Sequence, residues 1–65
     1  MDKKFCENLK DIRRMANLTQ KQVADKLNLT ESCYANWEQG RAEPNIASIR
    51  DLCKIFDISV EELFD

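Results

Sequence analysis

Apolar residues recur at spacings of three and four along almost the whole chain, a period that predicts helices. No window alternates with period two for long, and one glycine and one proline are too few for the turns of a β-sandwich or barrel. The predicted helices are Lys3–Ala16, Gln20–Leu27, Glu31–Gln39, Ile46–Phe56 and Val60–Phe64. We therefore expect an all-α fold of five helices.

Three short stretches predict where one helix ends and the next begins: Asn17-Leu18-Thr19, Asn28-Leu29-Thr30 and Asp57-Ile58-Ser59. Asn and Asp tolerate the left-handed conformation that follows a helix end, and Thr or Ser is a good N-cap. The Leu or Ile before each cap can pack onto the fourth residue of the next helix. A fourth helix start is predicted at Pro44-Asn45, with Asn45 as the cap.

The helical spacing also predicts which side chains form the core. These are Phe5, Leu9, Ile12 and Ala16 in the first helix, Val23, Ala24 and Leu27 in the second, Ile46, Ile49, Leu52, Cys53 and Phe56 in the fourth, and Val60, Leu63 and Phe64 in the fifth. A chain of 65 residues holds one domain with one small core. Such a core supplies only a few kcal/mol of stability, so a partner or a second copy could contribute.

The helix predicted at residues 31–39 carries one face of small polar side chains. At 100° per residue, an arc of about 140° holds Glu31, Ser32, Ala35, Asn36 and Gln39, while the aromatic residues lie on the other side. Short side chains with hydrogen-bonding ends suit a helix that lies close against the DNA major groove. There, Asn can pair with adenine, Glu can accept from cytosine and Ala can touch a thymine methyl. The alternative is a solvated face without lysine.

Several stretches together resemble the Cro/repressor-type (XRE) helix-turn-helix family. They are Leu18-Thr19-Gln20, Val23-Ala24, the turn Leu27-Asn28-Leu29-Thr30, Trp37-Glu38-Gln39-Gly40-Arg41, Pro44, and Leu52 through Leu63. The resemblance covers nearly the whole chain. It implies a single lambda-repressor-like domain over residues 1–65, with the helix-turn-helix at about 20–39, that binds double-stranded DNA and regulates transcription.

The resemblance also implies roles for particular residues. Base edges would be contacted by Glu31, Ser32 and Asn36, and phosphates by Gln20, Gln39 and Arg41, with Lys21 a further phosphate candidate by position and charge alone. Arg13 and Glu38 match a structural ion pair that ties the first helix to the end of the third. Glu31 departs from the family, which usually has a neutral or basic residue there. Readout of a base and support of the helix start both remain open for Glu31.

The net charge of −2 bears on DNA binding only through its distribution along the chain. Residues 55–65 hold four acids and no base, whereas residues 1–54 hold ten bases and eight acids. This permits a basic patch for DNA. The acidic pI of about 5.0 and Glu31 favour an alternative, a protein-interaction module that keeps the fold without binding DNA. Gln20, Arg41 and the uncluttered polar face oppose that alternative.

The composition argues against several other classes of protein. The chain has no histidine, no nucleophile–base spacing and no Gly-rich phosphate loop, so we expect neither an enzyme nor a cofactor. Three cysteines without a C-x-x-C motif argue against zinc and a disulfide framework. Cys6 and Cys53 are expected to pack, and Cys33 borders the polar face, where a redox role is the alternative. No ten consecutive residues are apolar, so we expect no membrane span and a cytoplasmic location.

We expect a homodimer, most simply a repressor on a palindromic operator, because two half-sites one helical turn apart strengthen binding. Ile55 and Phe64 are the predicted interface, since one short helix seldom buries both Leu63 and Phe64 in a small domain. The alternative is that Phe64 folds back onto the first helix. A phage-type repressor, a restriction–modification controller and an antitoxin with a protein partner are not separated by the sequence.

Overall fold

The computed structural model describes residues 3–65, and that part of the chain forms five helices and no strand. They are α1 Lys3–Met15, α2 Gln20–Lys26, α3 Glu31–Gln39, α4 Ile46–Phe56 and α5 Val60–Phe64. The prediction of an all-α, five-helix fold is confirmed. None of these helices has the length and hydrophobicity that crossing a bilayer requires.

Side-chain caps set the starts of four helices. Thr19, Thr30, Asn45 and Ser59 each have extended backbone, and each side chain accepts a hydrogen bond from the amide three residues later. Thr19 also forms a full capping box, because the Gln22 side chain accepts from the Thr19 amide at 2.8 Å. These bonds satisfy amides that a helix leaves without a partner, so the chain begins each helix at the predicted residue.

Left-handed residues set the helix ends. Asn17, Asn28 and Asp57 have φ of 59°, 59° and 54°, as the sequence predicts, and Gly40 has φ of 77°. The first two helices end one residue earlier than predicted, at Met15 and Lys26. The reason is that the last turn of each helix tightens before the Asn. The amides of Ala16 and Leu27 each donate to two carbonyls, three and four residues back, at 3.1 Å.

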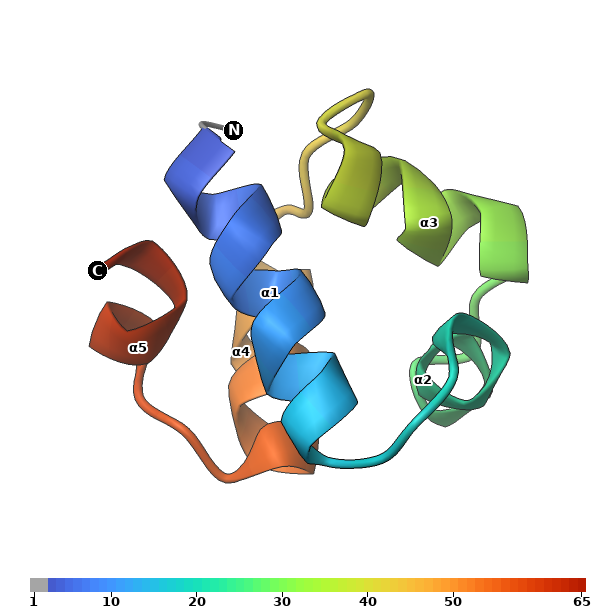
Figure 1. Ribbon diagram of the computed structural model, residues 1–65. Coiled ribbons are helices and arrows are strands. Elements are labelled where there is room, and N and C mark those ends of the chain that lie inside the picture. The colour runs from blue at the N-terminus through green and yellow to red at the C-terminus, as the bar shows by residue number, and fades with distance from the viewer. Residues whose placement is uncertain (1–2) are drawn as a thin grey trace.

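α1 is the central element of the arrangement (Figure 1). It packs against α3 on one side and α5 on the other, while α2 packs against α3. α4 lies behind α1 in this view and leads into α5. The pair α2 and α3 therefore forms one flank of the molecule, and α5 with the C-terminus lies on the opposite flank.

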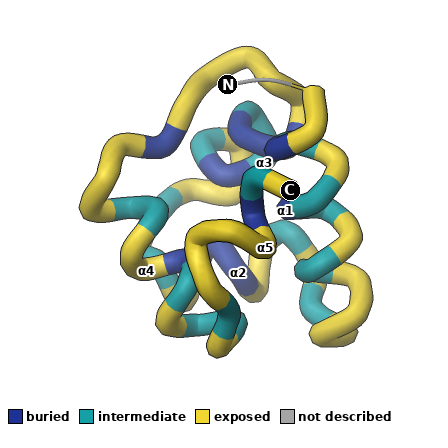
Figure 2. Tube along the Cα trace, turned by 90° about the vertical axis from the view of Figure 1, so that its left-hand side faces the viewer, coloured by how far each residue is buried: buried dark blue, intermediate teal, exposed yellow. Residues whose placement is uncertain are grey.

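The core draws on all five helices (Figure 2). Its buried members are Phe5 and Leu9 of α1, Val23 and Ala24 of α2, Tyr34 and Trp37 of α3, Leu52 of α4 and Leu63 of α5. The Tyr34 and Trp37 rings meet edge to face with centroids 5.9 Å apart. These two aromatics fix which side of α3 faces inward, because each ring removes a large apolar surface from water.

Three side chains predicted to be buried are exposed. Ile46 and Val60 are 72% and 51% exposed, and Ala16 is exposed as well. Ile46 and Val60 are the first residues of α4 and α5, and side chains in a helix lean toward its N-terminus, so both project past the end of their helix. Ala16 lies beyond the last residue of α1. Periodicity extended to the helix ends therefore overestimated the core.

Candidate nucleic-acid interface

α2 and α3 are joined by a turn of four residues, 27–30. Asn28 supplies the left-handed step, and the amide of Leu29 donates to the carbonyl of Ala24 at 2.9 Å. Leu29 packs against the core, which holds the turn down. Two helices that pack on each other across such a short turn form a helix-turn-helix unit, in which the second helix is free to face a ligand on its outer side.

α3 has the two faces that the sequence predicts. Tyr34, Trp37 and Glu38 are buried, with exposures of 0%, 5% and 3%. On the outer side, Glu31, Ser32 and Gln39 are exposed and Ala35 and Asn36 are partly exposed. The outer face therefore presents short polar side chains at the molecular surface, on a helix that the buried aromatics hold rigidly.

The residues expected to contact phosphates lie in different local settings. Gln39 and Arg41 are exposed at the end of α3 and just after it. Lys21 is exposed and pairs with Asp25 at 3.2 Å, four residues along α2. That pair is weak, because both side chains are more than 60% exposed and water screens their charges. The ammonium group of Lys21 can therefore turn toward a phosphate at little cost.

Gln20 has a role that sequence reasoning missed. Its side-chain amide donates to Glu38 Oε1 at 3.1 Å, so the first residue of α2 is tied to the end of α3. An amide nitrogen carries two hydrogens, and one of them remains for a phosphate oxygen. The bond to Glu38 thus orients Gln20 at the edge of the α3 surface.

Arg13 and Glu38 form a two-pronged ion pair between α1 and α3. Arg13 Nε donates to Glu38 Oε2 at 2.6 Å and Arg13 Nη2 donates to Glu38 Oε1 at 3.1 Å. Arg13 Nη1 donates to the carbonyl of Leu18 at 2.9 Å, and Tyr34 Oη donates to Glu38 Oε2 at 2.5 Å. One buried carboxylate therefore links α1, α2 and α3. Tyr34 stands four residues before Glu38, a helical spacing that could have revealed this partner.

This network controls the ionisation of its members. Burial by itself would raise the pKa of Glu38, but the hydrogen bonds from Arg13, Tyr34 and Gln20 outweigh burial and hold the pKa below its ordinary value. Burial and the neighbouring carboxylate of Glu38 raise the pKa of the Tyr34 phenol. The bond to Glu38 raises the pKa of Arg13. At neutral pH the pair is therefore fully ionised, with the phenol neutral.

Ile55 and Phe64, the predicted dimer interface, both pack partly against the core. The Phe64 ring lies against Phe5 of α1, with centroids 5.2 Å apart. Phe64 therefore lies against the first helix, which is the alternative to an interface, although its side chain is only partly buried. The large apolar side chains with the greatest exposure among residues 3–65 are instead Met15, Ile46 and Val60. The interface itself stays a prediction.

The three cysteines are partly buried thiols. Cys6 Sγ donates to the carbonyl of Trp37 at 3.4 Å, which places α1 against the last turn of α3. Burial and then the charge of Glu62 raise the pKa of the Cys53 thiol. Cys33 lies partly exposed at the border of the outer face of α3.

The fold and this surface define a helix-turn-helix protein. The Helix-turn-helix family model matches residues 9–63, and the chain belongs to this family, in its Cro/C1-type (XRE) branch. The members it resembles are named as regulators of transcription rather than as enzymes.

Relatives with curated descriptions match nearly the whole chain. It is 36% identical over 59 residues to the HTH-type transcriptional activator BcrR of Enterococcus faecalis, covering 91% of this chain and 29% of that protein. It is 39% identical over 59 residues to the uncharacterized HTH-type transcriptional regulator YqaE of Bacillus subtilis (strain 168), covering 91% and 51%. It is 30% identical over 60 residues to the cryptic phage CTXphi transcriptional repressor RstR of Vibrio cholerae, covering 92% and 54%.

The chain thus spans between 29% and 54% of the length of these three relatives. The shared part is the helix-turn-helix domain, and the relatives extend beyond it. No solved structure matches the chain significantly.

Proposed function

We propose that this chain is a sequence-specific DNA-binding domain that regulates transcription, with α3 inserted in the major groove. One observation carries the proposal: the buried Tyr34 and Trp37 rings hold α3 so that its opposite face presents small and mostly polar side chains. The major groove, about 12 Å wide, admits an α-helix, and short side chains with hydrogen-bonding ends allow that helix to lie close to the base edges. The names of the relatives as regulators of transcription support the same function.

The proposed contacts divide into two kinds. Base edges are read by Asn36, Ser32 and Glu31, whose amide, hydroxyl and carboxylate groups match different bases. Phosphates are held by Gln20, Lys21, Gln39 and Arg41, which fix the position of α3 without reading the sequence. Glu31 is also the first residue of α3, where a carboxylate stabilises the helix dipole. We assign it both functions.

We further propose that two copies bind a palindromic operator and repress by occupying it. RstR is named a repressor, although BcrR is named an activator. One domain makes few base contacts, and two half-sites about one turn apart multiply the affinity. Sedimentation of the complex on a palindromic duplex tests this: two chains per duplex are expected. One chain per duplex at saturation contradicts the dimer and leaves DNA binding intact.

The test of DNA binding is selection from a random duplex library, followed by fluorescence anisotropy at two salt concentrations. We expect one enriched sequence and an affinity that falls steeply with salt, because each phosphate neutralised adds about −0.9 to the slope of log K against log salt. No enrichment and no binding at low salt would favour the rival function, a protein-interaction module. Glu31 and the acidic character of residues 55–65 favour this protein-interaction module.

A further inference from the structure

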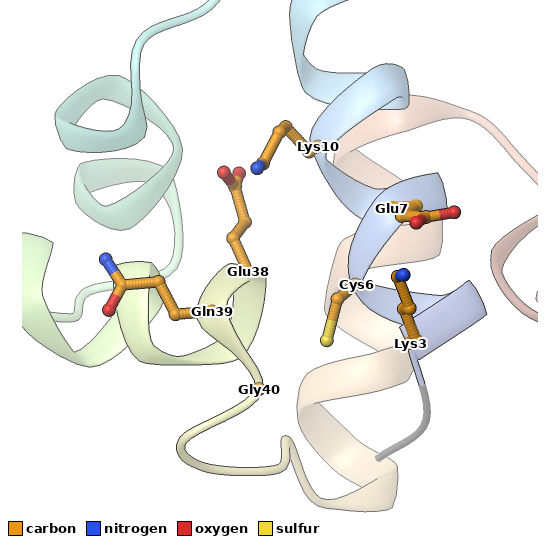
Figure 3. A pocket seen from close by; sticks show the side chains of 7 residues that line it. All are labelled: Lys3, Cys6, Glu7, Lys10, Glu38, Gln39 and Gly40. Atoms are coloured by element: carbon orange, nitrogen blue, oxygen red, sulfur yellow. The ribbon is translucent and has the colours of Figure 1, made fainter.

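A groove of about 410 Å³ separates the N-terminal half of α1 from the end of α3 (Figure 3). Lys3 and Lys10 line it on the α1 side, and Gln39 and Gly40 line it on the α3 side. Gln39 also belongs to the outer polar face of α3. The groove therefore opens directly beside the surface that we assign to DNA.

Lys10 points across the groove toward Glu38 (Figure 3). It is half-buried, yet it makes no ion pair with any residue in 3–65. The reason lies in Glu38, whose oxygens already accept four hydrogen bonds from side chains in that range, those of Arg13, Tyr34 and Gln20. A carboxylate has about four lone-pair sites, so Glu38 has no acceptor left for Lys10.

The charge of Glu38 is also balanced already. Arg13 holds both of its oxygens, so the ammonium group of Lys10 stands as a net positive charge with its donors available. Glu7 also lines the groove, but its carboxylate points away from α3 (Figure 3). Lys3 adds a second ammonium group at the outer end. The groove thus presents positive charge on the side that faces α3.

We propose that this groove receives the phosphate backbone of DNA beside the bases that α3 reads, with Lys10 as the main contact and Lys3 as the second. The proposal rests on the proposed function. Backbone strands border the major groove on both sides, so one of them runs past the end of a helix that lies in it. Gln20, at the start of α2, donates to Glu38, and Lys10 points toward Glu38, so both can donate to the same strand. The first helix thereby joins the DNA-binding surface.

The test compares wild type, Lys10→Gln and Lys4→Gln on the selected duplex over a series of salt concentrations. Lys4 is the matched control, because it is exposed on α1 but does not line the groove. Lys10→Gln should lower the magnitude of the salt slope by about 0.9, the effect of one lost phosphate contact. Its preference for the selected sequence over single-base variants should stay that of wild type, since a phosphate contact reads no sequence. Lys4→Gln should keep the wild-type slope.

A wild-type slope in Lys10→Gln overturns the groove assignment and leaves DNA binding standing. Wild type that binds no duplex overturns both. Equal melting temperatures of the three proteins exclude unfolding as the cause of a lower slope.

A second measurement needs no substitution. Acylation of lysines, read by mass spectrometry, should show Lys10 and Lys3 protected by the selected duplex while Lys4 stays reactive. Inorganic phosphate at the same ionic strength should leave Lys10 reactive. Protection by inorganic phosphate alone, or equal reactivity of Lys10 with and without duplex, contradicts the assignment.

Discussion

Glu38 shows how one side chain can organise three helices. It is 3% exposed and ionised, which is stable only because Arg13, Tyr34 and Gln20 satisfy both of its oxygens. The family resemblance implied its pairing with Arg13, but Tyr34 and Gln20 were not foreseen as partners. The spacing of residues along the sequence indicates which side chains can reach a carboxylate. Which of them do so depends on rotamers that only the packed structure determines.

The pH dependence of stability tests this network. The pKa of Glu38 in the fold lies below its ordinary value of about 4.3, so the ionised form stabilises the fold above that pH. The contribution is lost as the pH falls through the lowered pKa. Glu38→Gln should cost on the order of 3 kcal/mol at pH 7, because Arg13 loses its charged partner. Urea unfolding should show that the difference in free energy of unfolding between wild type and variant narrows below about pH 4. A difference that does not change with pH would mean that the charge of Glu38 does not stabilise the fold.

Two neighbouring residues of α3 should separate folding from recognition. Asn36→Ala should leave the free energy of unfolding within about 0.5 kcal/mol, because it changes a partly exposed side chain outside the caps. It should weaken binding to the selected duplex by about 1–3 kcal/mol, the value of a good base contact. Trp37→Ala should cost about 3–5 kcal/mol of folding, because it empties part of the core. Chemical denaturation and anisotropy check the pair. Lost stability in Asn36→Ala with unchanged sequence preference would place the reading face elsewhere on α3.

At the scale of elements, the chain signals its helices mainly at their boundaries. The four caps and the left-handed Asn17, Asn28 and Asp57 are local features that neighbouring residues determine, and the sequence predicts them all. Burial near helix ends is not local. Ile46 and Val60 fit the apolar stripe of their helices, yet both project past the packed region. Phe64 packs on Phe5, and this contact depends on how α5 lies against α1, which helical spacing does not predict.

Gly40 tests how α3 ends. Its φ is 77°, and a Cβ there would lie 3.5 Å from Cys6 Sγ, an ordinary contact. Gly40→Ala should therefore cost about 1–2 kcal/mol through backbone strain alone. Gly40→Asn should cost less, because Asn tolerates the left-handed conformation and both variants place a Cβ at the same point. Thermal unfolding gives the comparison. An Asn variant as unstable as the Ala variant would assign the cost to crowding at Cys6.

At the scale of the whole molecule, the proposed DNA-binding interface combines parts from distant segments. α3 presents the polar face, α2 contributes Gln20 at its start, and the residues after Gly40 add Arg41. The Arg13–Glu38 ion pair holds α3 against α1, so one network of side chains connects the core with the polar surface. The sequence predicts the candidate surface through helical angles and family resemblance. It does not predict the groove between α1 and α3, which exists only because these helices pack side by side.

Titration of the ¹⁵N-labelled chain with the selected duplex, followed through the backbone amide resonances, shows whether the outer face of α3 recognises DNA. We expect the largest shifts in α3, at Gln20 and at Arg41. Shifts that are largest outside both this surface and the predicted dimer interface, or shifts no different from those with a scrambled duplex, would contradict recognition by α3.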